Sequence, residues 1–101
     1  MPFIKVGPLS MVPPNSVAEA IDGENAYAVC NVGGELHVVE GFCPHAGGRL
    51  GQGQLSGKTL ICPWHCYEFD VVSGENLDNP FMRVATVPFK IEGDDIWIEV
   101  A

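Results

Sequence analysis

The chain has 101 residues, 47% of them hydrophobic, and its 13 acidic and 5 basic side chains leave a net charge of −8. This length suits one domain with one modest core, and neither a membrane-spanning apolar run nor a signal-peptide pattern is present, so we expect a cytoplasmic protein. The acidic balance argues against nucleic acid, whose phosphates attract Lys and Arg, and is compatible with a protein partner that carries a basic patch.

In chain order the sequence reads as short β-strands separated by turns. The expected strands cover residues 3–6, 17–22, 25–32, 35–40, 54–56, 59–61, 67–70, 84–92 and 96–100. Gly33-Gly34 supplies the positive φ angles of a tight hairpin turn between the third and fourth strands. Pro88 cannot donate to a neighbouring strand, so its strand should lie at an edge or be bulged. The pattern has no helical period and predicts a single all-β domain, a sandwich or small barrel, over residues 1–101.

Metal-ligating residue types gather in the middle of the chain. Cys43 and His45 form a C-x-H pair. Cys62 and His65 form a second, mixed Cys–His pair. Soft and borderline metals select Cys and His, so the four side chains predict a metal centre. Structural zinc sites usually pair Cys with Cys and His with His, which leaves a Cys2His2 zinc-binding domain as the alternative. Mixed pairs suit a binuclear iron cluster in which one iron takes both Cys and the other takes both His.

The segments CPHAGG, from Cys43, and CPWHCYEFD, from Cys62, resemble the motif of Rieske iron–sulfur domains. The resemblance implies the Rieske fold, in which antiparallel β-sheets carry a two-loop cluster-binding subdomain, here about residues 42–70. It also implies one [2Fe–2S] cluster. In that arrangement the two Cys are thiolate ligands of one iron, and His45 and His65 are ligands of the other.

The chain departs in two ways from the respiratory members of that family, and these differences indicate which kind of Rieske protein it resembles. Respiratory members brace the cluster loops with a disulfide, but the corresponding residues here are Gly48 and Trp64. Respiratory members also have hydroxyl donors to the cluster and thiolate sulfurs where this chain has Tyr67 and Phe69, and Phe69 has no donor. Fewer donors stabilise the reduced state less, which implies a low reduction potential. Cys66 stands where glycine is usual, and we interpret it as a free thiol.

The chain therefore resembles the low-potential Rieske ferredoxins of bacterial ring-hydroxylating dioxygenases, which belong to aromatic hydrocarbon catabolism. The resemblance implies a carrier and not an enzyme. Such a ferredoxin takes single electrons from a flavin-containing ferredoxin reductase and passes them to a terminal oxygenase. The sequence offers no nucleophile–base constellation that would favour an enzyme. The alternative within this fold is the small Rieske-like subunit of an assimilatory nitrite reductase.

The remaining residues of interest are interpreted as structural. Cys30 lies among apolar strand residues and is expected in the core. His37, with no Cys partner expected nearby, is assigned to the surface or to packing, and Arg49 to an exposed structural role. Residues 77–82, which contain Asn79-Pro80, are expected to be irregular. They match the position of the family's Pro-containing loop that covers the cluster.

Overall fold

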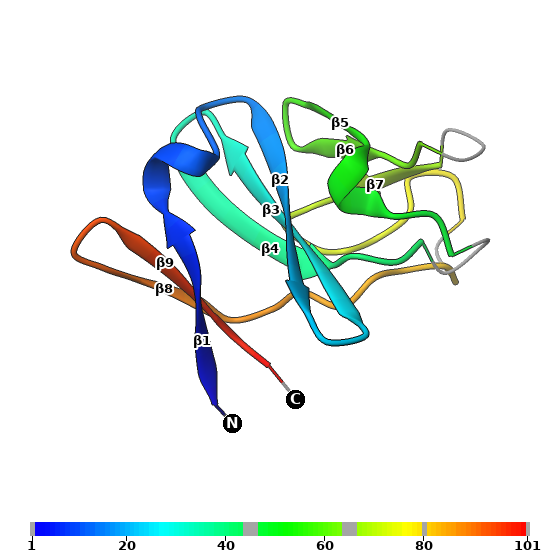
Figure 1. Ribbon diagram of the computed structural model, residues 1–101. Helices are drawn as coiled ribbons and strands as arrows, with labels where there is room; N and C mark the ends of the chain where they lie inside the picture. Colours follow the sequence, from blue (N-terminus) through cyan, green and yellow to red (C-terminus); the bar gives the residue numbers. More distant parts are fainter. Residues whose placement is uncertain (1, 44–46, 64–66, 80, 101) are drawn as a thin grey trace.

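The computed structural model describes residues 2–43, 47–63, 67–79 and 81–100 (Figure 1). The strands are β1 (Phe3–Pro8), β2 (Ser16–Asp22), β3 (Asn25–Val32), β4 (Glu35–Glu40), β5 (Gln54–Ser56), β6 (Thr59–Ile61), β7 (Glu68–Asp70), β8 (Phe89–Glu92) and β9 (Asp95–Glu99). Two short 3-10 helices are η1 (Leu9–Met11) and η2 (Leu50–Gln52). Neither could cross a membrane, and the described residues contain no other candidate. All strand pairs are antiparallel, so the predicted all-β class is confirmed.

The strands form three small sheets, ordered β1-β9-β8, β2-β3-β4 and β5-β6-β7. Figure 1 shows the β2-β3-β4 sheet between the other two. The central sheet is therefore covered on both faces, which explains why β3 is buried along most of its length instead of alternating between buried and exposed residues. The sequence pattern predicts a sandwich or a small barrel, and the stacked antiparallel sheets correspond to the sandwich.

Two apolar cores lie on the two faces of the central sheet. The site core consists of the buried residues Ala28, Cys30, Val39, Cys43, Leu50, Leu60, Cys62, Phe69, Val71 and Val84. The far core consists of the buried residues Val12, Ala20, Tyr27, Val29, Leu36, Val38, Ile96, Ile98 and Val100. Successive residues of β3 and β4 alternate between the cores, as side chains of a strand must. Both candidate Cys ligands therefore belong to the core beside the β5-β6-β7 sheet.

The strand predicted over residues 84–92 is too long. Only Phe89–Glu92 forms β8, and before it Thr86 makes a single bridge to Val39. Pro88 has no N–H to donate, so the ladder cannot continue through it, although its carbonyl oxygen accepts the N–H of Glu99 at 2.9 Å. The irregular stretch crosses from the site core to the β1-β9-β8 sheet, and this path depends on tertiary packing.

Replacing Gly74 by alanine is expected to destabilise the fold strongly. Gly74 has φ 84°, and a Cβ there would collide with the carbonyl oxygen of Val84. The N–H of Val84 in turn donates to the Gly74 carbonyl at 2.8 Å, so neither segment can move away without losing this bond. The left-handed backbone alone costs an alanine about 1 to 2 kcal/mol, and the collision adds about 1 to 3 kcal/mol.

The matched control is Gly57→Ala. Gly57 has φ 60°, but a Cβ there would meet nothing within 4 Å. This variant should therefore lose only the conformational part of the free energy of unfolding, measured by urea denaturation. An equal loss in the two variants would show that the close approach at Val84 is unimportant.

Candidate metal centre

The first candidate loop begins just after β4. The N–H of Cys43 donates to the carbonyl oxygen of Gly48 at 2.8 Å, and the N–H of Gly47 donates to the carbonyl oxygen of Cys43 at 2.8 Å. Phe42 and Arg49 form an antiparallel bridge immediately outside this pair. Backbone hydrogen bonds thus close the loop at its base, independently of any side chain.

The second candidate loop joins β6 to β7 and closes in the same way. The N–H of Cys62 donates to the carbonyl oxygen of Tyr67 at 2.7 Å, and Ile61 pairs with Glu68 directly outside it. In each loop the accepting carbonyl lies five residues after the Cys, from 43 to 48 and from 62 to 67. Each Cys therefore marks the base of a closed loop, and the two loops have equal spans.

The two cysteines lie at the inner ends of these loops. Cys43 is 2% exposed and Cys62 is 1% exposed, and both belong to the site core. The other two predicted ligands, His45 and His65, lie outside the described residues, as do Trp64 and Cys66. The described residues, which include two of the four predicted ligands, contain no group of three metal-ligating side chains. The buried cysteines fit iron ligation, because a metal neutralises thiolates that a dry core would otherwise disfavour.

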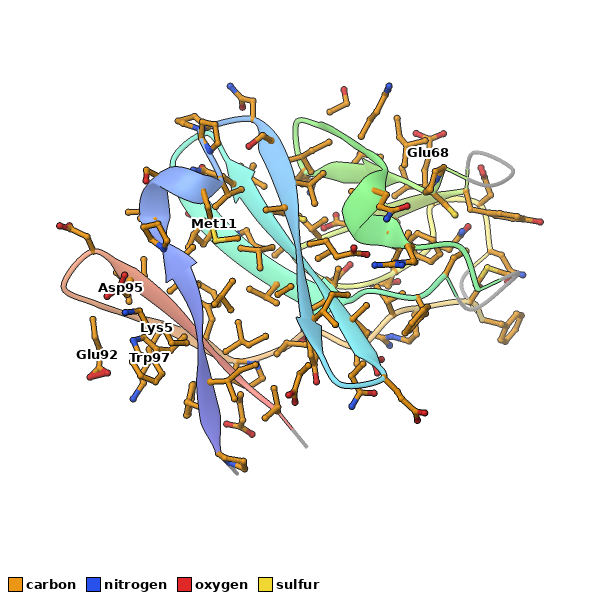
Figure 2. All side chains as sticks on the ribbon, in the orientation of Figure 1. Lys5, Met11, Glu68, Glu92, Asp95 and Trp97 are labelled. Carbon is orange, nitrogen blue, oxygen red and sulfur yellow. The ribbon has the colours of Figure 1, made fainter. Side chains whose placement is uncertain are left out.

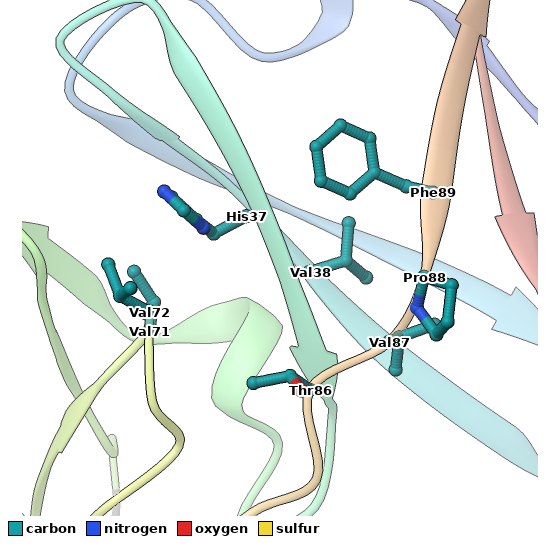
Figure 3. Close-up of a pocket in the computed structure, with 8 residues that line it drawn as sticks. All are labelled: His37, Val38, Val71, Val72, Thr86, Val87, Pro88 and Phe89. Atoms are coloured by element: carbon teal, nitrogen blue, oxygen red, sulfur yellow. The ribbon is translucent and has the colours of Figure 1, made fainter.

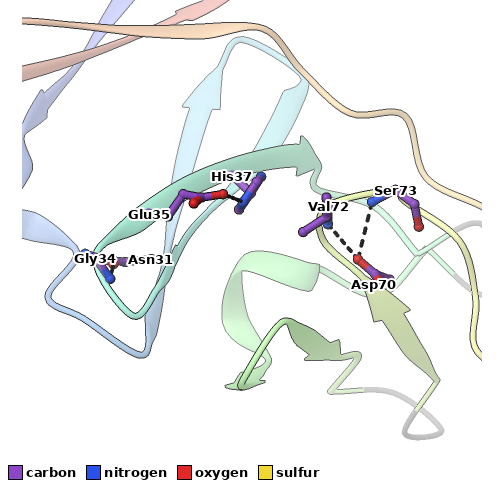
Figure 4. A network of polar contacts seen from close by, with 7 residues as sticks. All are labelled: Asn31, Gly34, Glu35, His37, Asp70, Val72 and Ser73. Carbon is purple, nitrogen blue, oxygen red and sulfur yellow. Dashed lines mark hydrogen bonds and ion pairs between the residues drawn. The ribbon is translucent and has the colours of Figure 1, made fainter.

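His37 lies in β4 and borders a cavity of about 370 Å³, shown in Figure 3. The cavity is lined mainly by apolar side chains from the segments after β7 and before β8. The Nε2 atom of His37 lies 2.7 Å from Oε1 of Glu35 (Figure 4), and the ring is 20% exposed. These contacts agree with the prediction of a surface or packing role.

Cys30 lies directly opposite His37 in the β3–β4 register. Sequence reasoning expected no Cys near this histidine, and that expectation is wrong. The Cys30 thiol is fully buried and lies 4.0 Å from the carbonyl oxygen of Ala28. Burial raises the pKa of this thiol to about 12, so it stays protonated at neutral pH. The predicted role of Cys30 as a core residue is confirmed.

Arg49 holds the first loop against the central sheet. Its Nε donates to Oε2 of Glu19 at 2.8 Å and its Nη2 to Oε1 at 2.5 Å, a two-pronged contact with β2. Paired donors of this kind fix direction as well as distance. The structural role predicted for Arg49 is confirmed.

Asp70 organises the turn that follows the second loop. Its carboxylate accepts the backbone N–H of Val72 at 2.8 Å and of Ser73 at 3.3 Å (Figure 4), and it lies 3.2 Å from Nζ of Lys58. Burial alone would raise the pKa of Asp70, but the hydrogen bonds from Val72, Lys58 and Ser73 lower it below the usual range. The turn is therefore held by an ionised carboxylate.

Asn76 is the structural residue near the second loop that sequence reasoning missed. Its side chain is buried, at 5% exposed, and its Oδ1 atom accepts the N–H groups of Asp78 and Asn79, both at 2.8 Å. Asparagine commonly folds back on the backbone two residues ahead, and this signal could have identified it. The described residues of the 77–82 segment form no regular ladder, as expected.

Comparison with known proteins gives one consistent family. A family model described as the Rieske [2Fe–2S] domain matches residues 3–88. The naphthalene 1,2-dioxygenase ferredoxin component of Pseudomonas aeruginosa is 35% identical over 75 residues, covering 73% of this chain and 72% of that protein. The 3-phenylpropionate/cinnamic acid dioxygenase ferredoxin subunit of Shigella flexneri is 33% identical over 89 residues, covering 86% and 84%.

Solved structures agree in fold. The Sphingomonas yanoikuyae B1 ferredoxin superimposes with a TM-score of 0.87 at 25% identity, covering 99% of this chain and 100% of that one. A protein described as an NADH-dependent nitrite reductase small subunit from Mycobacterium tuberculosis reaches 0.85 at 18% identity, covering 99% and 96%. At that identity the likeness is one of fold alone.

Proposed function

The chain belongs to the Rieske [2Fe–2S] family, and on that premise we propose that it carries single electrons from a flavin-containing reductase to a terminal aromatic-ring-hydroxylating oxygenase. The observation that carries the proposal is which proteins the relatives are. The two relatives described above, 35% and 33% identical over most of both chains, are ferredoxin components of aromatic dioxygenase systems. The protein is an electron-transfer component, and its cofactor is a Rieske [2Fe–2S] cluster.

The proposal assigns cluster ligation to Cys43, His45, Cys62 and His65. The bound cluster supplies one-electron chemistry. The backbone bonds to Gly48 and Tyr67 fix the bases of the loops, and the site core keeps water from the two cysteines. His45 and His65 follow in the same loops and are assigned to the second iron. Two closed loops of equal span, each with a buried Cys at its base, support this assignment.

Membership of the Rieske family also supports proposals about the domain organisation and the cellular compartment of the protein. We assign one Rieske domain to residues 1–101 and a cluster-binding subdomain to about residues 42–70. Both closed loops and the β5-β6-β7 sheet fall inside that segment, which supports the division. We place the protein in the cytoplasm, where cysteines stay reduced and available for iron.

Two rivals predict different partners or metals. A nitrite reductase small subunit shares the fold, but the likeness to one at 18% identity favours no function. A Cys2His2 zinc domain would carry no electron at all. Both rivals can be tested by measuring electron delivery directly.

The chemically reduced protein is expected to pass one electron per chain to a terminal oxygenase. The probes are the purified oxygenase components of the naphthalene 1,2-dioxygenase and 3-phenylpropionate dioxygenase systems. Anaerobic stopped-flow absorbance should show the protein reoxidised as at least one oxygenase is reduced, and no reoxidation in the absence of oxygenase. Failure with both oxygenases would refute the proposed function, and reduction of a nitrite reductase large subunit instead would favour the first rival.

A further inference from the structure

The described residues 76–79 and 81–82, here called the asparagine loop, are braced by hydrogen bonds among themselves. The Oδ1 atom of Asn76 accepts the N–H groups of Asp78 and Asn79, and Oδ1 of Asn79 accepts the N–H of Phe81 at 3.0 Å. The N–H of Asn76 donates to the carbonyl oxygen of Met82 at 3.0 Å and closes the loop. These hydrogen bonds join residues of the loop to one another, so they stabilise the loop without any contact made by the Phe81 side chain.

The braced loop holds Phe81 out in solvent. Among the large apolar side chains that the structure describes, Phe81 is the most exposed, at 95%, and Leu77 on the same loop is 54% exposed. A ring this exposed contributes little to the stability of its own fold, because the gain from apolar burial is lost. Interfaces, by contrast, are enriched in aromatic residues that a partner buries.

The asparagine loop lies at the same end of the molecule as the candidate metal centre (Figure 1). The N–H of Leu77 donates to the carbonyl oxygen of Glu68 at 3.0 Å, one residue after the second loop closes at Tyr67. Met82, next to Phe81, packs against the core that contains both cysteines. A protein that approaches this end to exchange an electron is therefore positioned to contact Phe81.

Acidic side chains outnumber basic ones around the loop. Glu75 and Asp78 are exposed and take part in none of the ion pairs between described residues. Figure 2 shows Lys5 on the β1-β9-β8 sheet, far from Glu68, which lies beside the second loop. Lys90 lies on the same distant sheet, and its Nζ atom is 4.7 Å from the centroid of the Phe3 ring. Arg83, which follows the loop, is also exposed, but it lies opposite Glu75 in an antiparallel bridge, and its Nη2 atom donates to the carbonyl oxygen of Ser73 at 3.1 Å. The loop end thus combines an apolar side chain with two acidic neighbours and one basic neighbour, and a partner of complementary charge encounters such a surface faster.

We propose that Phe81, assisted by Leu77, is the apolar contact on which the terminal oxygenase docks. The inference rests on the proposed function. The oxygenase is preferred over the reductase because a solved structure of the same fold is described as a complex of reduced oxygenase and oxidized ferredoxin, in carbazole 1,9a-dioxygenase. The complementary surface is an apolar pocket bordered by Lys or Arg. In the docked pair one electron leaves the reduced ferredoxin and enters the oxygenase, and the ferredoxin returns to its oxidised form.

The test compares Phe81→Ala with Ile91→Ala as the matched control. Ile91 is 45% exposed, but it lies in β8, on the sheet away from both cysteines. Each variant is reduced and mixed with whichever probe oxygenase the unmodified protein reduces faster. For Phe81→Ala the ferredoxin concentration that gives half the maximal rate should rise roughly tenfold, as for a central interface aromatic. The maximal rate and the absorbance spectrum should stay unchanged, and Ile91→Ala should match the unmodified protein.

Each alternative outcome overturns the inference in a recognisable way. If the unmodified protein reduces an oxygenase and Phe81→Ala does so equally well, the inference fails while the proposed function stands. A loss seen only when a flavin-containing reductase delivers the electron would assign Phe81 to the reductase. A loss of self-association in analytical ultracentrifugation, with electron transfer unchanged, would assign it to a second copy. If the unmodified protein reduces neither oxygenase, the function and the inference fall together.

Discussion

Replacing Cys62 by alanine is expected to abolish cluster binding, so that the purified protein loses its red-brown colour and nearly all of its iron and acid-labile sulfide. Cys62 is buried at the base of a closed loop, in the same core as Cys43. An iron that loses one of two thiolates has no substitute nearby among the described residues, because no third ligand-type group accompanies this pair. Iron and sulfide analysis of the purified variant measures the effect.

The matched control is Cys30→Ala. Cys30 is also fully buried in the site core, but it is not a predicted ligand. Its loss should cost about 1 kcal/mol of stability, typical of a point substitution, and should leave iron and sulfide in equal amounts. Retention of the cluster in Cys62→Ala, or one zinc and no sulfide in the unmodified protein, would contradict the ligand assignment.

Local signals explain what the sequence could predict. Gly33 and Gly34 adopt φ 59° and 105°, the positive angles that the predicted hairpin between β3 and β4 requires. The spacing of Cys43 and Cys62 predicted two loops, and both loops are closed directly at these residues. Signals of this kind depend on neighbours in the chain, so they can be read from the sequence alone.

Contacts between distant segments explain what the sequence could not predict. The stretch before β8 looked like strand, but Thr86 makes only one bridge, to Val39, more than forty residues earlier. Cys30 faces His37 because the β3–β4 register places them opposite each other. Asn76 gains its bracing role because its side chain is buried within its own loop. Each of these features depends on packing that has no single-residue signature.

The candidate site divides in the same way. The sequence motif identified Cys43 and Cys62 as candidate ligands. Packing brings both residues into one core, and their spacing in the sequence does not predict this. His45 and His65 stay predictions, supported by the family and by the closed loops that carry them. Their assignment is therefore best tested by measuring the midpoint potential, which depends on the total charge of the ligands.

Replacing His65 by cysteine is expected to lower the midpoint potential by about 125 mV. In the oxidised state two ferric ions, two sulfides and two thiolates sum to zero, and a third thiolate adds one negative charge that resists reduction. The unmodified protein should lie near the low end of the Rieske range, about −150 mV, because Phe69 offers no hydroxyl to the cluster sulfurs. Clusters with four Cys ligands lie near −400 mV, and one substitution should cover about half of that gap. Protein-film voltammetry gives both values, after iron and sulfide analysis shows that the variant keeps its cluster.

A charge change outside the ligand set separates ligation from simple electrostatics. Arg49→Gln also makes the protein more negative by one unit, close to the first loop, but its guanidinium is half exposed and already paired with Glu19. Water and salt screen such a surface charge, so this control should shift the potential far less than His65→Cys does. If the two variants shifted the potential equally, or if His65→Cys raised it, His65 would not be a ligand of the reducible iron. A large downward shift confined to His65→Cys is the result that ligation by this residue requires.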